Sequence, residues 1–543
     1  MLKIEYYLRE ITDQALRDLG YPETDYQIER PKQAAHGDFS INAAMLLARP
    51  LKQNPRQIGQ ALLAALKPDS ERISKIEIAG PGFINLFLSN RELERVVRDI
   101  HGEGKDFGRI PATGKTALVE FVSANPTGPL TVGHGRQAVI GDTVANLLSW
   151  IGYEVTREYY FNNAGRQMRV LGNSVLIRYR QLLGEDIEFP EDHYQGDYIR
   201  DIAQNLMAEK GRDLAGGDLK VFTHAAEKAI FADIDKTLQS INIVFDTYFN
   251  ESDLYTQGKI EEVIQALRDK DLAYDHDGAV WFRATNFGLD QDRVIVKSSG
   301  EPTYRLPDIA YHRNKFARGY DEIVDIFGAD HIATYPDVLA GLQALGYETE
   351  KIRVLILQFV TLMEGQEKIK MSTRKANYVT LDELIEEAGG DVTRWFFLMR
   401  SIQSHLNFDL KLAKNQSDEN PVYYNQYAHA RICSIIRTAE ERGLTFAGDI
   451  DLGYIEEPSE KELVKKLMEF PRVVLKCGTD YEPHQLTQYL SEVSTTFHKF
   501  YTDCRVITED DRLSQGRLAL CLATRTVLAN GFSILGIDAP ERM

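Results

Sequence analysis

The chain has 543 residues, 43% of them hydrophobic and 27% charged, which is typical of a soluble globular protein with several domains. Its formal net charge of −18 excludes a molecule that is basic over its whole surface. A local cluster of lysine and arginine would still suffice for nucleic-acid binding, so charge alone leaves the class of partner open.

No apolar run approaches the ~20 residues of a membrane span, and the first residues, MLKIEYYLRE, have no apolar signal core. We therefore expect a cytoplasmic protein without a membrane segment. The four cysteines lie far apart and form no CxxC pair, which predicts buried free thiols and neither a structural metal nor a disulfide framework. They are Cys433, Cys477, Cys504 and Cys521.

Residues 1–108 are expected to form a small α/β domain. Helical patterns cover residues 4–19 and 57–66, and KIEIAGPGFINLFLS (residues 75–89) predicts two paired strands around a Pro-Gly turn. The following stretch, HGEGKDFGRIPATG, is rich in glycine and charge and is the first candidate linker.

Residues 109–405 have the rhythm of a doubly wound α/β domain. The near-continuous apolar run TALVEFVS (residues 116–123) predicts a strand buried on both faces. Apolar residues then recur at helical spacing from Val144 to Ile151, and EVTREYYFN (residues 154–162) predicts the next strand. This strand–helix–strand unit predicts a parallel, Rossmann-like sheet.

Two further strands are expected in this domain, at residues 321–331 and at RVLILQFVTL (residues 353–362). Residues 165–277 are mostly polar with helical periodicity and predict a helical insertion. Residues 406–543 differ, because nearly every segment beyond Asn420 reads as an amphipathic helix. We expect an all-helical bundle there.

The turn after the first strand, in FVSANPTGPLTVGHGRQAVIGD, concentrates prolines and glycines. Glycine permits a close backbone approach, and a helix that starts near Gly133–Gly135 would aim free N–H groups into the crevice at the strand ends. A bound nucleotide is the functional interpretation, and a mere connection is the alternative. GRIPATGKT (residues 108–116) is not a phosphate loop, because its glycine spacing is too long and it precedes a strand.

The stretch PLTVGHGR (residues 129–136) resembles the His-Ile-Gly-His signature of class I aminoacyl-tRNA synthetases. IKMSTRKANYVTLDEL (residues 369–384) resembles their second signature, Lys-Met-Ser-Lys-Ser, and follows in the expected order. With the flanking VEFVSANPTGP and ADHIATYPDVLAGLQALGY, the chain is similar to bacterial-type arginyl-tRNA synthetases. The resemblance runs from QAAHGDFSINAAMLLA near the start to the closing VLANGFSILGIDAPERM.

This resemblance implies an α/β multidomain enzyme with a tRNA-contacting N-terminal domain, a Rossmann-like catalytic domain and a helical anticodon-binding domain. It implies that ATP, supplied with Mg²⁺, activates L-arginine to arginyl-adenylate, and that arginine then passes to the 3′ end of tRNA(Arg). It also implies a cytoplasmic monomer. Such a reaction needs positioning and charge stabilisation rather than a protein nucleophile.

The resemblance assigns catalytic roles to His134, Lys370 and Arg374. ATP binding is implied for Thr131, Gly133, His134, His331, Lys370, Met371 and Ser372. His331 also has the alternative of a capping or buried histidine. Two positions depart from the signatures, because Thr131 replaces the first histidine and Thr373 replaces the second lysine. The division of labour among Lys368, Lys370, Arg374 and Lys375 is left open.

Arginine binding is implied for Glu120, Ser123, Asn125, Glu251, Tyr304 and Asp308. A guanidinium is planar with five donors, so two carboxylates suit it. We expect Asp308 and Glu251 to bind the guanidinium, and Asn125 and Ser123 to hold the amino-acid end. The alternative for each lone acid is a solvated surface carboxylate.

In the predicted bundle, NPVYYNQYAHARICSI (residues 420–435) interleaves aromatic and basic residues. By resemblance, Tyr427 and Arg431 are candidates for stacking on anticodon bases and for phosphate contacts. The alternative is that the tyrosines form the buried stripe of a helix.

The sequence argues against three rival functions. An adenylyl- or cytidylyltransferase would usually be shorter and lack the helical bundle. Another class I synthetase, for glutamate or cysteine, would lack the two-carboxylate pocket. A tRNA-binding paralogue without catalysis is favoured only by Thr131 and Thr373.

Overall fold

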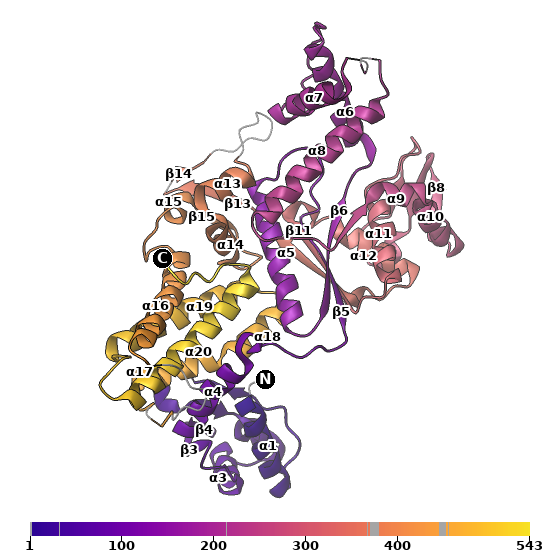
Figure 1. Cartoon of the computed structure of the whole chain (residues 1–543). Coiled ribbons are helices and arrows are strands. Elements are labelled where there is room, and N and C mark those ends of the chain that lie inside the picture. Colours follow the sequence, from indigo (N-terminus) through magenta and orange to yellow (C-terminus); the bar gives the residue numbers. More distant parts are fainter. Residues whose placement is uncertain are drawn as a thin grey trace.

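The computed structural model describes residues 3–543 except 32, 213, 215, 366, 370–378, 445–451 and 454. A central parallel sheet lies between the α6–α8 helices at one end and the C-terminal helices at the other, and the N-terminal unit packs beside those C-terminal helices (Figure 1). This arrangement confirms the predicted α/β multidomain fold with a doubly wound catalytic core.

The N-terminal unit is a four-stranded antiparallel sheet, in the order β1-β2-β4-β3, with helices against it. Its strands β3 and β4 form the predicted hairpin around the Pro-Gly turn. The strands are β1 (Ile28–Glu29), β2 (Phe39–Ile41), β3 (Ile73–Ala79) and β4 (Phe83–Leu88), and the α-helices are α1 (Lys3–Asp18), α2 (Ala43–Leu51), α3 (Pro55–Ala65) and α4 (Asn90–Glu103).

The central sheet has the order β12-β11-β5-β6-β7, and all of its strands are parallel. After β5 the chain adds β6 and β7 on one side of that strand, and later adds β11 and β12 on its other side. The direction in which strands are added therefore reverses between β5 and β11. In such sheets the crevice at this reversal is where ligands bind. The strands are β5 (Thr116–Glu120), β6 (Glu154–Phe161), β7 (Thr247–Asn250), β11 (Glu322–Gly328) and β12 (Ile352–Leu357).

Both faces of this sheet are covered, as the apolar run of β5 predicts. Leu118 belongs to one hydrophobic core, and its neighbours Ala117 and Val119 belong to the other. Helix α5 (Val132–Trp150) covers one face, and α11 (Arg305–Ala317) with α12 (Tyr335–Leu345) covers the opposite one. The loops at the strand ends are thereby held on a rigid scaffold.

The range 165–277 is only partly the predicted helical insertion. The helices α6 (Gly165–Leu182), α7 (Asp197–Lys210) and α8 (Leu219–Gln239) pack on one another, but β7 returns to the central sheet. A four-residue strand is too short for sequence periodicity to reveal. A small antiparallel sheet follows, with β8 (Ala273–His276), β9 (Ala279–Phe282) and β10 (Arg293–Val296) beside α9 (Glu251–Thr256) and α10 (Lys259–Asp269).

The single strand predicted at residues 353–362 is two strands of different sheets, β12 and β13 (Val360–Glu364). The break falls at Gln358, whose carbonyl accepts a hydrogen bond from buried Arg136 at 2.9 Å instead of continuing the ladder. β13 pairs with β14 (Glu367–Lys368) and β15 (Leu406–Asp409), near α13 (Leu381–Ala388), α14 (Gly390–Leu398) and α15 (Leu410–Ala413).

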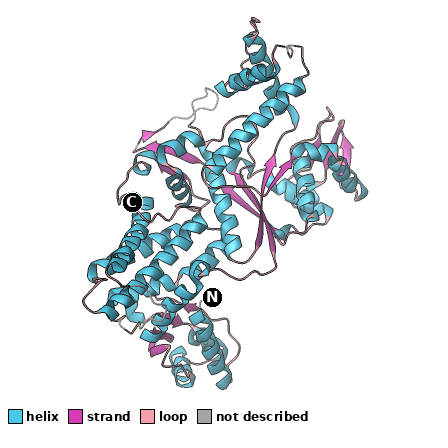
Figure 2. Ribbon diagram, in the orientation of Figure 1, coloured by secondary structure: helices cyan, strands magenta, loops and turns pink. Residues whose placement is uncertain are grey.

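The C-terminal region is the predicted bundle of helices (Figure 2). They are α16 (Pro421–Glu441), α17 (Pro458–Met468), α18 (Phe470–Asp480), α19 (His484–Asp503) and α20 (Asp511–Leu535). By length and composition α20 could cross a membrane, but 72% of its apolar window is buried inside the protein, as in a core helix. The four cysteines are free and buried, which confirms the prediction of buried free thiols.

Candidate active site and tRNA-binding surface

The turn after β5 has a strained backbone. Val122 and Ser123 have φ angles of 66° and 41°, although neither is a glycine. A non-glycine residue in this region costs about 1–3 kcal/mol, and such strain gathers at functional sites. Ser123 Oγ donates to Glu120 Oε1 at 2.9 Å and accepts from the Tyr160 amide at 3.1 Å, so side chains hold the turn in place.

Helix α5 begins with a capping box between Thr131 and His134. The Thr131 amide donates to His134 Nδ1 at 3.2 Å, and Thr131 Oγ1 accepts from the His134 amide at 3.5 Å. Because Nδ1 accepts, the ring proton lies on Nε2, which is left as the donor for a ligand. Burial lowers the pKa of His134 and so favours this neutral form, whereas Asp330 acts in the opposite direction.

The backbone beside this cap is open. Gly133 is exposed, and a Cβ built on it would meet only Thr131 Oγ1, at 3.7 Å. At Gly141, two turns further on, a Cβ would lie 2.2 Å from the ring of Phe121. The first glycine therefore leaves room for a ligand at the positive end of the helix, and the second lets α5 pack on the turn.

The described end of the second signature region lies beside the first signature. Thr380 forms a single antiparallel bridge with Thr131, and the Leu381 amide donates to the Leu130 carbonyl at 2.8 Å. The predicted residues Lys370, Met371, Ser372 and Arg374 lie outside the described residues. What the structure brings together is the chain that follows them and the start of α5.

The end of β11 supplies two further polar groups near the start of α5, since Asp330 acts on the pKa of His134. The ring of His331 stacks on Phe327, with centroids 4.9 Å apart and planes inclined by 18°. His331 Nε2 lies 3.6 Å from a carboxylate oxygen of Asp330. Both side chains are exposed rather than buried in the core, which leaves them available to a ligand.

Asp308 on α11 and Glu251 on α9 interact electrostatically, and we call the place between these two acids the acidic pocket; neither acid has an ion pair with a described residue. The Asp308 carboxyl has no hydrogen bond or ion pair within the described part of the chain, and Glu251 Oε2 accepts from the Tyr160 hydroxyl at 2.9 Å. Burial raises the pKa of Asp308 to about 7, and Glu120 and Glu251 act in the same direction. Burial also raises the pKa of Glu251. Two acids so placed suit a cationic ligand.

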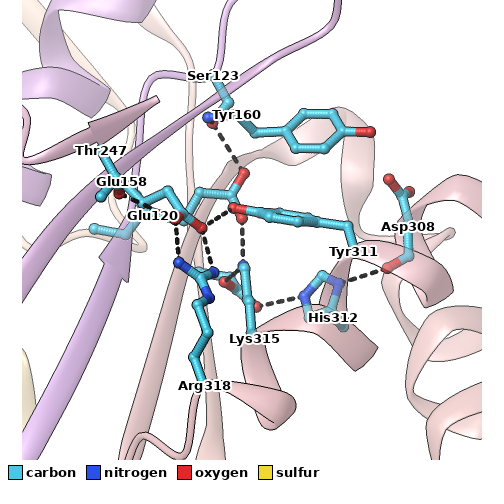
Figure 3. A network of polar contacts seen from close by, with 12 residues as sticks. Glu120, Ser123, Glu158, Tyr160, Thr247, Asp308, Tyr311, His312, Lys315 and Arg318 are labelled. Carbon is cyan, nitrogen blue, oxygen red and sulfur yellow. Dashed lines mark hydrogen bonds and ion pairs between the residues drawn. The ribbon is translucent and has the colours of Figure 1, made fainter. Parts of the chain in front are cut away.

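Glu120 is placed differently from these two acids. It is buried, and its Oε2 accepts from Lys315 Nζ at 2.5 Å while Oε1 accepts from Ser123 (Figure 3). Both carboxylate oxygens are therefore already engaged within the protein. Two other predicted arginine ligands, Asn125 and Tyr304, have exposed side chains, and Tyr304 is 77% exposed. Their side chains have no hydrogen bond to a described residue.

Sequence reasoning missed the polar network behind the pocket. His312 and Lys315 lie on α11, four and seven residues after Asp308. This spacing places them on the same face of a helix as Asp308, and it was the one signal in the sequence that could have indicated the network. On β6, Glu158 accepts a hydrogen bond from the hydroxyl of Tyr311 at 2.6 Å and forms an ion pair with Arg318. These groups are drawn in Figure 3.

Sequence reasoning also missed Arg136 and Arg394, two buried arginines that hold α5. Arg136 donates to backbone oxygens of Gln358, Ser401 and Ser404 at 2.9–3.0 Å. Arg394 donates to Asp142 Oδ2 at 2.6 Å and to the carbonyls of Ile241 and Leu535 at 2.7 Å. The second set ties α5 to the inserted helices and to the end of α20.

A cavity of about 820 Å³ lies at the surface of the bundle, between α16, α19 and the C-terminus. The Arg431 guanidinium lies over the rings of Tyr427 and Tyr501, at 4.9 and 5.1 Å from their centroids. Tyr427 is 42% exposed rather than part of a buried stripe. The arginines that line the cavity are Arg431, Arg437, Arg442, Arg505 and Arg542. Exposed rings among cations suit unstacked bases and phosphates.

Comparisons with known families agree along the chain. Residues 6–88 match "Arginyl tRNA synthetase N terminal domain" and residues 99–396 match "tRNA synthetases class I (R), catalytic domain". Residues 425–543 match "DALR anticodon binding domain". The three matches follow the order of the regions described above.

The "Arginine--tRNA ligase" of Salinibacter ruber is 50% identical, with 99% of this chain and 100% of that protein covered. The protein of the same name from Desulfotalea psychrophila is 51% identical, with 95% of each covered. A crystal structure of a putative arginyl-tRNA synthetase from Campylobacter jejuni superposes with a TM-score of 0.78 at 30% identity, covering 84% of this chain and 100% of that one. The resemblance seen in the sequence is confirmed, and the chain belongs to the arginyl-tRNA synthetase family of class I synthetases.

Proposed function

We propose that this chain activates L-arginine with ATP and transfers it to the 3′ end of tRNA(Arg), acting as a cytoplasmic monomer. The observation that carries the choice of amino acid is the pair Asp308 and Glu251 beside the nucleotide crevice, two acids with raised pKa values that form no ion pair with any residue described in the structure. A guanidinium supplies the missing charge and enough donors for both carboxylates.

ATP, with Mg²⁺ as part of the substrate, would lie across the start of α5. The open backbone at Gly133 and the Nε2–H of His134 would contact its phosphates or ribose, with Thr131 as the cap that orients the imidazole. Thr131 thus has a structural role that does not need a second imidazole. By family resemblance, Lys370 and Arg374 would approach the pyrophosphate, with Met371, Ser372 and His331 as neighbours. Together these groups would stabilise charge rather than supply a nucleophile.

Two displacements complete the reaction. An oxygen of the arginine carboxylate attacks the α-phosphorus of ATP, and pyrophosphate leaves. A hydroxyl of the terminal tRNA ribose then attacks the carbonyl carbon of arginyl-adenylate, and AMP leaves with the bonding electrons. Ser123 and Asn125 at the turn would hold the amino-acid end, and Tyr304 would close the pocket near Asp308.

The arginine-rich cavity at Tyr427 and Arg431 would receive the anticodon loop. The whole chain carries a charge of −18, so this local positive surface is what makes tRNA binding compatible with the composition. Helix α16, which carries both residues, lies apart from the central sheet in Figure 1, as a partner that contacts two separate parts of the enzyme would require.

The test is charging of bulk tRNA with each amino acid in turn, in the presence of ATP and Mg²⁺. We expect arginine alone to be charged and Asp308→Asn to lose at least about 100-fold in kcat/KM for arginine. The matched control is Asp253→Asn, an exposed acid on α9, which should stay within about twofold because surface changes are usually small. Charging of another amino acid would contradict the proposal, and tRNA binding without any charging would favour the inactive paralogue.

A further inference from the structure

Lys315 is a fully buried lysine on the helix that carries Asp308. Its side chain is 0% exposed, and its Nζ lies 2.5 Å from Glu120 Oε2 and 2.6 Å from Asp325 Oδ1. The same ammonium lies 4.3 Å from the ring centroid of Tyr311. Figure 3 shows it at the centre of the polar contacts behind the pocket.

The contacts of Lys315 continue in both directions. On one side, Glu120 Oε1 accepts from Ser123 Oγ at 2.9 Å, in the strained turn. On the other side, His312 donates from Nε2 to Asp325 Oδ2 at 2.8 Å and from Nδ1 to the backbone oxygen of Asp308 at 2.8 Å. One line of polar contacts therefore joins the turn after β5 to the helical turn that presents Asp308.

Stability alone is a weak reason for such a network. Burying ions costs solvation, and well-packed apolar residues of similar size often serve folding as well or better. What an apolar core could not do is fix the carboxylate of Glu120 and place a positive charge close behind an acidic substrate pocket. The network therefore has a use at this position that ordinary packing would not supply.

We propose that Lys315 is a positioning residue of the arginine site. By binding Glu120 and Asp325 together, it holds the turn at Ser123 and the Asp308 turn of α11 in fixed relative positions. With its oxygens engaged, Glu120 acts through these contacts, and binding of the guanidinium falls to Asp308 and Glu251. This inference rests on the proposed role of those two acids as arginine ligands.

The charge of Lys315 also acts on Asp308. The groups that face Asp308 are His312 and Lys315 from its own helix, Glu120 from β5, Glu251 and Tyr255 from α9, and Tyr160 from β6. Of these, His312 and Lys315 favour the ionised carboxylate, whereas burial and the other acids oppose it. Removal of Lys315 should therefore raise the pKa of Asp308, and arginine binding should require a higher pH.

The experiment measures tRNA charging by Lys315→Met, Lys315→Met/Asp325→Asn and the exposed control Lys297→Met. For each protein, kcat and the KM values for arginine and ATP are determined at saturating tRNA across pH 5.5–9, and folding is checked by circular dichroism and thermal unfolding. The double variant removes one positive and one negative charge together, and its asparagine can still accept from His312.

We expect Lys315→Met to raise the arginine KM about tenfold or more while the ATP KM stays within about twofold. The acid limb of kcat/KM for arginine should move up by about one pH unit. In the double variant Asp308 still lacks the charge of Lys315, so the limb should stay moved, and the arginine KM should stay raised because Glu120 is still not held. The control should match the wild type.

A folded Lys315→Met with wild-type arginine KM and an unmoved acid limb would overturn the proposal. Equal losses for arginine and ATP without a pH shift would also overturn it, since they indicate a merely structural residue. If Lys315→Met does not fold, the arginine KM of the double variant is the deciding measurement. A wild-type value of that KM refutes the positioning role of Lys315. Failure of the proposed function would look different, because the wild-type enzyme itself would not charge arginine.

Discussion

Replacing Asp308 by asparagine should separate stability from function. The carboxyl sits in a pocket where burial raises its pKa from 3.8 to about 7. Its ionised form is therefore unfavourable in the folded protein until a cation arrives. Asparagine keeps the size of the side chain, removes the charge and can still form hydrogen bonds.

The sign of the effect follows from the direction of the shift. The folded-state pKa lies above the unfolded value, so the folded protein binds the extra proton between about pH 4 and pH 7, and stability falls as pH rises through that window. The difference between the folded and unfolded pKa values of Asp308 corresponds to a loss of about 4 kcal/mol in the free energy of unfolding above pH 7. Because the side chain is partly exposed, solvent screening reduces this loss to about 2 kcal/mol. Asp308→Asn should gain about this amount at pH 8.5 and less than about 1 kcal/mol at pH 5.

The assay is thermal unfolding of wild type and variant at pH 5 and pH 8.5, with and without arginine. At about 2 °C per kcal/mol for a unit of this size, the variant should unfold about 4 °C higher at pH 8.5. Arginine at 100 times its Kd should stabilise the wild type by about 2.7 kcal/mol and the variant far less. A variant that is less stable than wild type at pH 8.5, or that keeps the full arginine effect, would refute the reasoning.

The other predictions concern the start of α5 and the bundle. Gly133→Ala should leave the free energy of unfolding unchanged but raise the ATP KM at least about tenfold. Gly141→Ala should lower the free energy of unfolding in urea by about 1–3 kcal/mol, because its Cβ meets Phe121. Equal stability of the two variants would argue against the packing described. Thr131→Ala should lower stability by about 1 kcal/mol and reduce kcat as the imidazole loses its orientation, and an unaffected kcat would remove Thr131 from the site. Arg431→Ala should raise the KM for tRNA about tenfold and flatten its salt dependence, without changing the KM for arginine; a changed arginine KM would point to misfolding instead.

Much of the candidate site follows from local sequence. The near-continuous apolar run around Leu118 predicts a strand buried on both faces, and Thr131 with His134 stands at the start of the predicted helix. The helical spacing of Asp308 and Lys315 is also present in the sequence, although the role of the lysine emerges only from the structure. Such features depend on residues within a turn or two of each other, so periodicity and side-chain chemistry are enough to find them.

Only the tertiary structure decides which distant groups meet. Glu120 and Lys315 are 195 positions apart, and Thr131 meets Thr380 across a still longer stretch of chain. The sequence contains no local signal for either contact. The first arises from packing α11 against the parallel sheet, and the second from placing Thr380, after the signature residues, beside the start of α5. Lone acids look alike in sequence, yet burial and a neighbouring ammonium make Glu120 a held carboxylate, whereas the Asp308 carboxyl forms no ion pair with the described part of the chain. Charge and solvation in the assembled core, which depend on all neighbours at once, set that difference.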